Sequence, residues 1–149
     1  MYARMLIATD GSELATRALE HGLNLAKLMR AEVTIVTVTE PNAVIGAGYF
    51  SAAGTVFDPL PELIKGQEEA ARRVLQAAET LATGAGVVVK TTHVENSFPA
   101  EGIIETANRI GAELIVMGSH GRRGLGRLLL GSQTGNVLAH SKIPVLVTR

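Results

Sequence analysis

The sequence contains no cysteine among its 149 residues. This absence excludes a disulfide framework and metal sites built on thiolates, and it is typical of proteins from a reducing compartment. Apolar runs of membrane-spanning length are also missing, and the run that follows Met1 is too short and wrongly flanked for a signal peptide. We therefore expect a soluble, cytoplasmic protein without membrane insertion.

The chain also lacks net charge, because fourteen basic residues balance fourteen acidic ones. No long-range field attracts a polyanion, so we expect no nucleic-acid partner. The balance is uneven along the chain, since residues 118–149 carry five basic side chains and no acidic one. This distribution favours a local anion site over a nucleic-acid surface.

The length and the 46% apolar composition allow one hydrophobic core, and we expect a single domain over residues 1–149. Short runs rich in Val, Ile, Leu and Thr predict five strands, and apolar residues at helical spacing predict four helices between them. The predicted strands cover residues 4–9, 32–39, 86–94, 113–118 and 143–148. The helical spacing falls within residues 14–29, 63–81, 103–110 and 137–139.

Strands that alternate with helices predict right-handed crossovers, and continuous apolar strands need cover on both faces. The predicted fold class is α/β: a doubly wound, Rossmann-like, five-stranded parallel sheet with strand order 3-2-1-4-5 and helices on both faces. In this order the strand over residues 143–148 lies at an edge. An uncovered apolar edge invites pairing, so we expect a twofold homodimer in which these strands run antiparallel.

Glycine and proline indicate where the helices end and begin. Residues 84–86 and Gly111 are typical of helix stops before strands, and Pro99 suits a first helical turn. The connection over residues 40–59 is unusually long and has no charge between Glu40 and Asp58. It either folds over its own apolar side chains or serves as a lid or partner-binding surface.

Residues 117–136, "MGSHGRRGLGRLLLGSQTGN", combine glycines, hydroxyls and three arginines without an acid. The stretch follows the fourth predicted strand and runs into the last helix, so it lies at the carboxyl rim where doubly wound sheets bind ligands. Glycines let the backbone turn through positive φ and approach an anion, and the start of a helix favours phosphate. The predicted ligand is a phosphate chain.

Other interpretations of these residues stay open. The glycines also suit ordinary loops, the arginines suit a solvated loop, and Ser132 suits a helix N-cap. The stretch is not a Walker A loop, because no G-K-[ST] follows the glycines, and no G-x-G-x-x-G follows the first strand. Asp10 either reaches a ribose hydroxyl or a phosphate-bound Mg²⁺, or caps the first helix.

With these residues in view, the chain resembles the universal stress protein family, in particular its ATP-binding branch. The resemblance extends over nearly the whole length, in "ATDGS" (8–12), "SFPAEGIIETA" (97–107), "AELIVMGSHG" (112–121) and "LLLGSQTGNVLAHSKIPVLV" (128–147). Gly118, Gly121, Gly131 and Ser132 match the family's G-x-x-G-x9-G-[ST] motif completely.

The resemblance implies an adenine nucleotide alpha hydrolase-like fold and a pocket for ATP or another adenine nucleotide, with Mg²⁺, at the ends of strands one, two and four. It also implies the homodimer through residues 143–148. Ala8, Thr9 and Asp10 match the first wall, and Val38 matches the position beside adenine. The phosphate and ribose contacts match Met117, Gly118, Ser119, His120, Gly121, Gly131, Ser132, Gln133 and Thr134.

Two groups of residues fit the family pattern less closely. Arg122, Arg123 and Gly124 belong to "RRGLGR", for which we know no fixed pattern, and they either tighten phosphate binding or serve a protein partner. His120 faces the ligand by resemblance, with a bond to a neighbouring carbonyl as the alternative. The remaining histidines suggest no metal cluster, and we expect them to be surface or capping residues: His21, His93 and His140.

Three hypotheses about function follow. We favour an ATP-binding regulator of the stress response with little or no turnover, because no paired acid accompanies the loop to activate a nucleophile. The second is a slow ATPase, or an enzyme that phosphorylates itself on Ser132 or a nearby hydroxyl. The third is a dimeric interaction module that needs no nucleotide.

Overall fold

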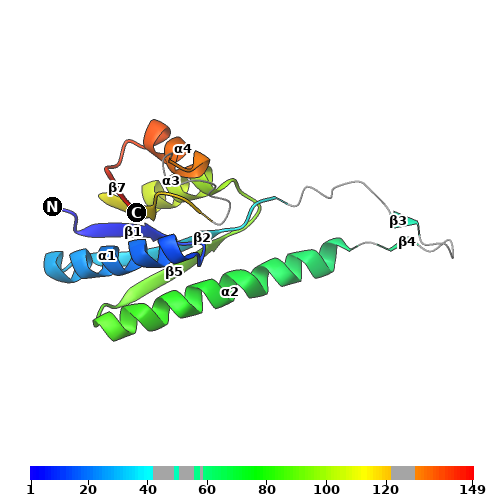
Figure 1. The fold of residues 1–149 in the computed structure, drawn as a ribbon, viewed down its shortest axis with the longest axis horizontal. Helices are drawn as coiled ribbons and strands as arrows, with labels where there is room; N and C mark the ends of the chain where they lie inside the picture. Colours follow the sequence, from blue (N-terminus) through cyan, green and yellow to red (C-terminus); the bar gives the residue numbers. More distant parts are fainter. Residues whose placement is uncertain (42–48, 51–55, 58, 122–129) are drawn as a thin grey trace.

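The computed structural model describes residues 1–41, 49–50, 56–57, 59–121 and 130–149. Its main sheet is five-stranded and parallel, in the order β5-β2-β1-β6-β7 (Figure 1). Counted along the chain within this sheet, the order is 3-2-1-4-5, which confirms the predicted fold class. The strands are β1 (Arg4–Ala8), β2 (Glu32–Val38), β5 (Val89–Val94), β6 (Leu114–Gly118) and β7 (Val145–Thr148).

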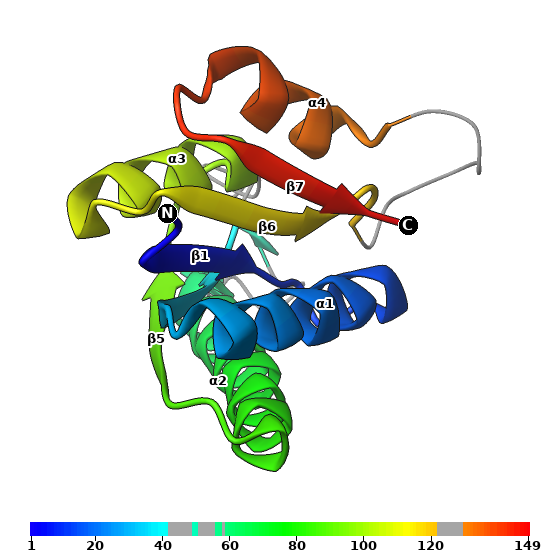
Figure 2. The same ribbon diagram turned by 90° about the vertical axis from the view of Figure 1, so that its left-hand side faces the viewer.

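Helices cover both faces of this sheet. Figure 2 shows α1 (Glu13–Met29) and α2 (Leu60–Ala85) on one side, and α3 (Pro99–Ile110) and α4 (Ser132–His140) on the other. Side chains alternate along β1, so Ile7 packs toward α1 and α2 while Leu6 packs toward α3 and α4. Two separate apolar cores result, and β1, at the centre of the sheet, contributes to both.

The ends of the helices follow the sequence signals closely. Ser12 is the N-cap of α1, and its hydroxyl accepts a hydrogen bond from the Ala15 N–H at 3.3 Å. Pro99 begins α3, and Gly111 ends it in the left-handed conformation, as predicted. Gly86 ends α2 in the same way, but Gly84 lies inside that helix, so the predicted stop holds only for Gly86.

The segment before α2 differs from the sequence expectation. The structure places two short strands there, β3 (Tyr49–Phe50) and β4 (Val56–Phe57), which pair antiparallel as a separate small sheet. Residues 42–48, 51–55 and 58 lie outside the described residues, so the two interpretations of the 40–59 connection both remain predictions. Helix α2 begins at Leu60, and its N-terminal end extends well beyond the sheet (Figure 1).

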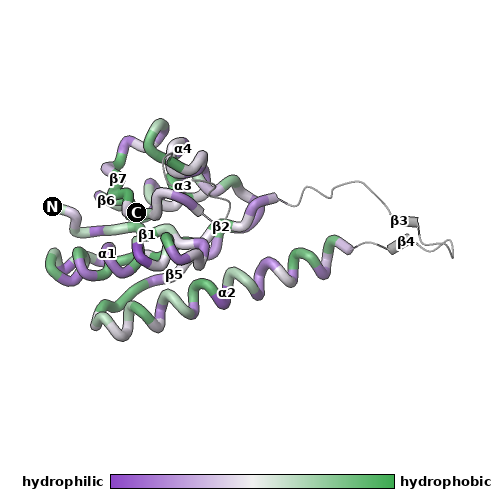
Figure 3. Tube along the Cα trace, viewed as in Figure 1, coloured by the Kyte–Doolittle hydropathy of each residue, from purple (hydrophilic) through white to green (hydrophobic). Residues whose placement is uncertain are grey.

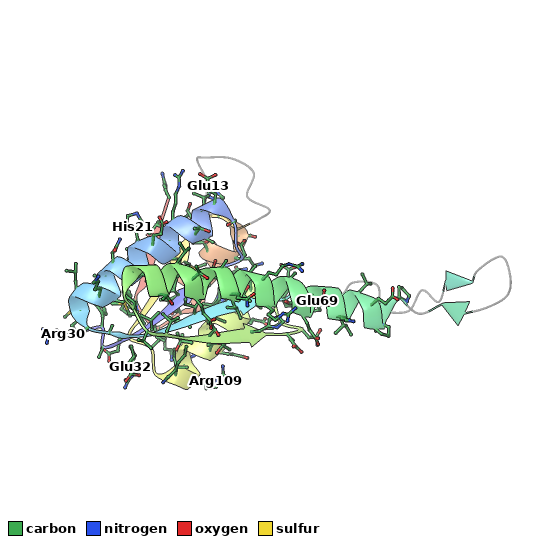
Figure 4. All side chains as sticks on the ribbon, turned by 90° about the horizontal axis from the view of Figure 1, so that it is seen from below. Glu13, His21, Arg30, Glu32, Glu69 and Arg109 are labelled. Atoms are coloured by element: carbon green, nitrogen blue, oxygen red, sulfur yellow. The ribbon has the colours of Figure 1, made fainter. Side chains whose placement is uncertain are left out.

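Hydrophilic and hydrophobic residues alternate along α2, which is typical of an amphipathic helix (Figure 3). Charged and polar side chains such as Glu13, His21 and Glu69 point outward from α1 and α2 (Figure 4). In the described part of the chain, no helix is both long and apolar enough to cross a membrane. His21 and His140 are exposed, as expected.

Candidate functional site

A pocket of about 460 Å³ lies where the carboxyl ends of β1, β2 and β6 meet the start of α4, with α2 as a further wall. Its position matches the ligand crevice of doubly wound sheets. The lining residues are Ala8, Asp10, Ala15, Thr37, Val38, Thr39, Glu40, Gln67, Ala70, Ala71, Val74, Pro99, Met117, Gly118, His120, Gly121, Gly131, Ser132, Gln133 and Thr134.

The turn after β6 and the start of α4 are joined by two hydrogen bonds. The Gly131 N–H donates to the Ser119 carbonyl at 2.8 Å, and the buried Thr134 hydroxyl donates to the Gly118 carbonyl at 2.9 Å. The Ser119 N–H in turn donates to the Thr148 carbonyl on β7 at 2.8 Å. The two ends of the glycine-rich stretch that the structure describes, residues 117–121 and 130–136, therefore converge on one side of the pocket.

Close packing, rather than positive φ, accounts for the three motif glycines. A Cβ on Gly121 would lie 2.8 Å from Asp10 Oδ2, and one on Gly131 would lie 3.1 Å from the Ser119 carbonyl oxygen. A Cβ on Gly118 would lie 3.2 Å from the backbone of Leu14. Among the described glycines, positive φ occurs at Gly11, Gly86 and Gly111. The expected turn through positive φ is therefore wrong for the three motif glycines.

The first turn of α4 faces the pocket. Gly131 is the N-cap of α4. No side chain in the described part of the chain caps this helix. Ser132 is therefore the first helical residue and not the N-cap, and it is exposed. The amides of Ser132, Gln133 and Thr134 precede the first intrahelical bond, which runs from Gly135 N–H to the Gly131 carbonyl at 2.9 Å.

Gln133 is held in place from the opposite helix. Its side-chain carbonyl accepts a hydrogen bond from the Ala100 N–H in the first turn of α3, at 3.2 Å. This contact satisfies one of the N-terminal amides of α3 and holds the side-chain amide of Gln133 in one orientation. Its amide NH₂ group is the donor that remains to interact with a ligand in the pocket.

Of the sixteen predicted site residues, eleven line the pocket, two described residues do not, and three are not described by the structure. Thr9 and Ser119 are buried behind the pocket: the Thr9 hydroxyl accepts from the Gly11 N–H at 3.2 Å, and the Ser119 hydroxyl lies 3.1 Å from His120 Nδ1. Arg122, Arg123 and Gly124 lie outside the described residues. The eleven lining residues are Ala8, Asp10, Val38, Met117, Gly118, His120, Gly121, Gly131, Ser132, Gln133 and Thr134.

Asp10 does not cap α1, because Ser12 fills that position. Its Oδ1 accepts from the Ser12 N–H at 2.9 Å, which fixes the carboxylate at the end of β1, and its Oδ2 is directed toward Gly121. The carboxylate thus lies between the first strand and the glycine turn. Asp10 and Glu40 are the two acidic residues in the described lining.

Sequence reasoning missed one entire wall of the pocket, formed by α2. This wall contains Gln67, Ala70, Ala71 and Val74. A signal was available, because Gln67 is the polar member of a row at helical spacing whose other members are apolar: Leu63, Ala70, Val74, Ala78 and Leu81. His93 was also misplaced: it is half-buried on β5, and its Nε2 lies 2.7 Å from the hydroxyl of Thr39 in the pocket.

These features define a class: doubly wound α/β proteins with a glycine-lined crevice at the carboxyl rim of a parallel sheet. Comparison with known sequences identifies one family within that class. The sequence model of the universal stress protein family matches residues 1–149. The chain belongs to the universal stress protein family.

Individual relatives cover the whole chain. Universal stress protein MJ0531 of Methanocaldococcus jannaschii is 36% identical over 150 residues, which span 100% of this chain and 83% of the relative. The solved structure of MJ0577, a universal stress protein of the same organism, superposes with a TM-score of 0.81 at 32% identity, covering 99% of this chain and 96% of its own. A universal stress protein crystallised in complex with cAMP superposes with a TM-score of 0.69 at 25% identity, covering 99% and 97%.

Proposed function

We propose that this protein binds ATP, or another adenine nucleotide, in the pocket at the carboxyl rim, and that it is a nucleotide-dependent regulator of the stress response in the cytoplasm. The pocket volume of about 460 Å³ falls in the range of small-molecule sites. A relative of this family binds the adenine nucleotide cAMP. The superposition covers 99% of the present chain, so the whole domain of that relative has its counterpart here.

One observation carries the proposal: the Gly131 N–H to Ser119 carbonyl bond brings the glycine turn and the start of α4 to the same side of the pocket. The uncapped first-turn amides then provide donors and the positive end of the helix dipole, both of which favour phosphate oxygens. The Gln133 NH₂ group adds a donor from a side chain that α3 already orients.

The other end of the pocket suits the nucleoside. Val38 and Met117 come from strand ends, and Ala70, Ala71 and Val74 come from the facing helix, so this part offers apolar contact to a flat base. Asp10 stands between this apolar part and the glycine turn, where its carboxylate can accept a hydrogen bond from a ribose hydroxyl.

The residues present also fit Mg²⁺, provided that phosphate supplies most of its ligands. No group of three or more His, Cys, Asp or Glu residues in the described part of the chain can hold a metal alone. Mg²⁺ commonly uses one or two carboxylates together with phosphate oxygens and water. As the alternative to the ribose contact, Asp10 is the carboxylate at the glycine turn that would hold Mg²⁺, and the ion would neutralise phosphate charge.

The lining favours binding over turnover. Efficient phosphoryl transfer needs a group that deprotonates or positions the nucleophile, and the titratable side chains in the described lining are Asp10, Glu40 and His120. His120 Nδ1 already lies 3.1 Å from the Ser119 hydroxyl. A second candidate, slow transfer of phosphate to Ser132, is favoured by one observation: this side chain is exposed at the pocket and does not cap α4.

We also propose a homodimer through the strand at residues 143–148. β7 pairs with β6 on one side and forms the edge of the sheet, as predicted from the strand order. An edge strand presents unpaired backbone groups that a second copy of the same strand can satisfy antiparallel about a twofold axis. In such a regulator, a protein partner would bind a dimer in which each of the two pockets either holds a nucleotide or is empty.

The direct test is to purify the protein gently, denature it and identify any released small molecule by mass. An adenine nucleotide at a substantial fraction of the protein concentration supports the proposal. A protein that releases none, and whose melting temperature does not change with millimolar ATP and Mg²⁺, supports the nucleotide-independent module instead. Incubation with ATP followed by mass analysis of the intact chain tests transfer to Ser132.

A further inference from the structure

A histidine behind the pocket contacts a threonine that lines it. His93 lies on β5 with 18% of its side chain exposed, and its Nε2 is 2.7 Å from the hydroxyl of Thr39, which follows β2. On the other side of the ring, Nδ1 lies 3.6 Å from Oε1 of Glu95. Glu95, His93 and Thr39 thus form a polar relay that ends at the pocket wall.

The hydroxyl is the polar group that Thr39 can present to a ligand. Its backbone N–H donates to the Val94 carbonyl at 2.8 Å, and its backbone carbonyl accepts from the Ser97 N–H at 3.1 Å. Both backbone groups are therefore engaged with the end of β5 and the turn that follows. These bonds also fix the position of Thr39, so that His93 meets its hydroxyl from a rigid strand end.

The relay determines the direction of the hydrogen bond between Thr39 and His93. The 3.6 Å contact with Glu95 is longer than a hydrogen bond, but the nearby carboxylate, which can only accept, favours the neutral tautomer in which Nδ1 of His93 carries the proton. In a neutral ring Nε2 is then an acceptor, and the Thr39 hydroxyl donates to it. With its proton directed at His93, the oxygen of Thr39 presents lone pairs, which makes it an acceptor toward the pocket.

We propose that this relay selects the base of the bound nucleotide: Thr39 accepts a hydrogen bond from the exocyclic amino group of a 6-aminopurine and disfavours a 6-oxopurine, whose oxygen only accepts. The inference rests on the proposed nucleotide binding. Thr39 contacts the ligand, whereas His93 and Glu95 are positioning residues that hold the hydroxyl in one orientation. Loss of either end of the relay therefore changes discrimination between bases rather than affinity for phosphate.

The test compares ATP with inosine triphosphate (ITP), which differs from ATP only in carrying an oxo group at C6 and a proton at N1. Calorimetric titration of the parent is expected to show that ATP binds roughly tenfold more tightly than ITP, which corresponds to the contribution of one good hydrogen bond. In Thr39→Val the preference falls to about one, while Thr39→Ser, which keeps the hydroxyl, retains most of it. In His93→Phe the hydroxyl is released, and the preference narrows because ITP gains affinity.

Thr91→Val is the matched control. Thr91 lies on β5 like His93, and its hydroxyl donates to Glu79 Oε1 at 3.0 Å, so this variant also loses a hydrogen bond between side chains but lies outside the described lining. Its ratio of ATP to ITP affinity is expected to equal that of the parent. Because both ligands carry the same triphosphate, damage at the phosphate end changes both affinities and leaves the ratio intact.

The outcomes separate this inference from the proposed function. If the parent binds ATP and ITP equally, or if Thr39→Val keeps the parent's ratio, the relay does not select the base, and nucleotide binding itself stands. If the parent binds neither ligand, the proposed function and this inference both fail. Should His93→Phe not fold, the comparison of Thr39→Val with Thr39→Ser decides alone.

Discussion

The amide of Gly131 and the carbonyl of Ser119 form a 2.8 Å hydrogen bond across twelve residues of sequence, and this bond closes the phosphate side of the proposed site. It works together with the Thr134 hydroxyl, which donates to the Gly118 carbonyl. Between them, a strand end and a helix start become a single rigid wall.

The first prediction concerns Thr134, a residue that is 2% exposed and whose hydroxyl donates to the Gly118 carbonyl. Thr134→Val keeps the shape of the side chain but removes the donor to the buried Gly118 carbonyl, so the free energy of unfolding is expected to fall by about 1 to 2 kcal/mol. Chemical denaturation measures this loss. Thr134→Ser restores the donor and is expected to recover most of it, and an equal loss in both variants would contradict a role for the hydrogen bond.

The second prediction concerns the contact between Gly121 and Asp10. In Gly121→Val the new Cβ would lie 2.8 Å from Asp10 Oδ2, so the carboxylate has to move and the branched side chain enters the pocket. We expect the rise in melting temperature on adding ATP and Mg²⁺ to be lost, with the protein still folded. A full ATP-dependent rise in this variant would show that the ligand does not approach the glycine turn.

The third prediction compares glycines inside helices. A Cβ on Gly66 or Gly84 in α2 meets nothing within 4 Å, so Gly66→Ala and Gly84→Ala are each expected to raise the unfolding free energy by about 0.5 to 1 kcal/mol. Gly22 in α1 is different, because its Cβ would lie 2.7 Å from Ile7 Cδ1 in the core. Gly22→Ala is expected to destabilise, and stabilisation measured by denaturant titration would contradict the packing described here.

The fourth prediction tests the proposed dimer. Leu146 on β7 is 36% exposed, and Leu146→Glu would place two like charges close together across a twofold pair of β7 strands. We expect the dissociation constant to rise at least about tenfold, measured by sedimentation at several concentrations. Leu63→Glu on α2, where the native side chain is 42% exposed, is the matched control and should leave the mass unchanged. A parent that sediments as one chain at micromolar concentration would contradict the dimer.

The sequence was sufficient to predict the main sheet and the four helices around it, because the signals for these elements were local and repeated, whereas the small β3–β4 sheet was not predicted. Pro99 marks the start of a helix, and Gly86 and Gly111 mark the ends of helices between the apolar strands. The resulting alternation of strands and helices allows only a few topologies. The edge position of β7 followed from that topology alone. The site residues at the ends of β1, β2 and β6 could be predicted in the same way, because the carboxyl ends of parallel strands lie at one edge of the sheet.

The α2 wall could not be predicted from strand ends, since it depends on how a long helix crosses the sheet. Gln67 and His93 resemble ordinary helix and strand residues in the sequence, and only packing brings the first to the pocket and the second against Thr39. The roles of the motif glycines were also misjudged, because local sequence does not distinguish a glycine needed for positive φ from one needed for close approach. The close neighbour of Gly131 is the carbonyl of Ser119, which lies twelve positions earlier in the sequence and is brought alongside only by the fold.

The most direct test of the phosphate wall compares one substitution at two positions of the same helix start. Gly131→Ala places a Cβ 3.1 Å from the Ser119 carbonyl oxygen and 3.3 Å from the backbone of His120, whereas a Cβ on Gly135 meets nothing within 4 Å. Calorimetric titration with ATP and Mg²⁺ is expected to show affinity reduced about tenfold or more in Gly131→Ala and unchanged in Gly135→Ala. The account would be contradicted if both variants bound ATP as tightly as the parent, or if the parent did not bind ATP.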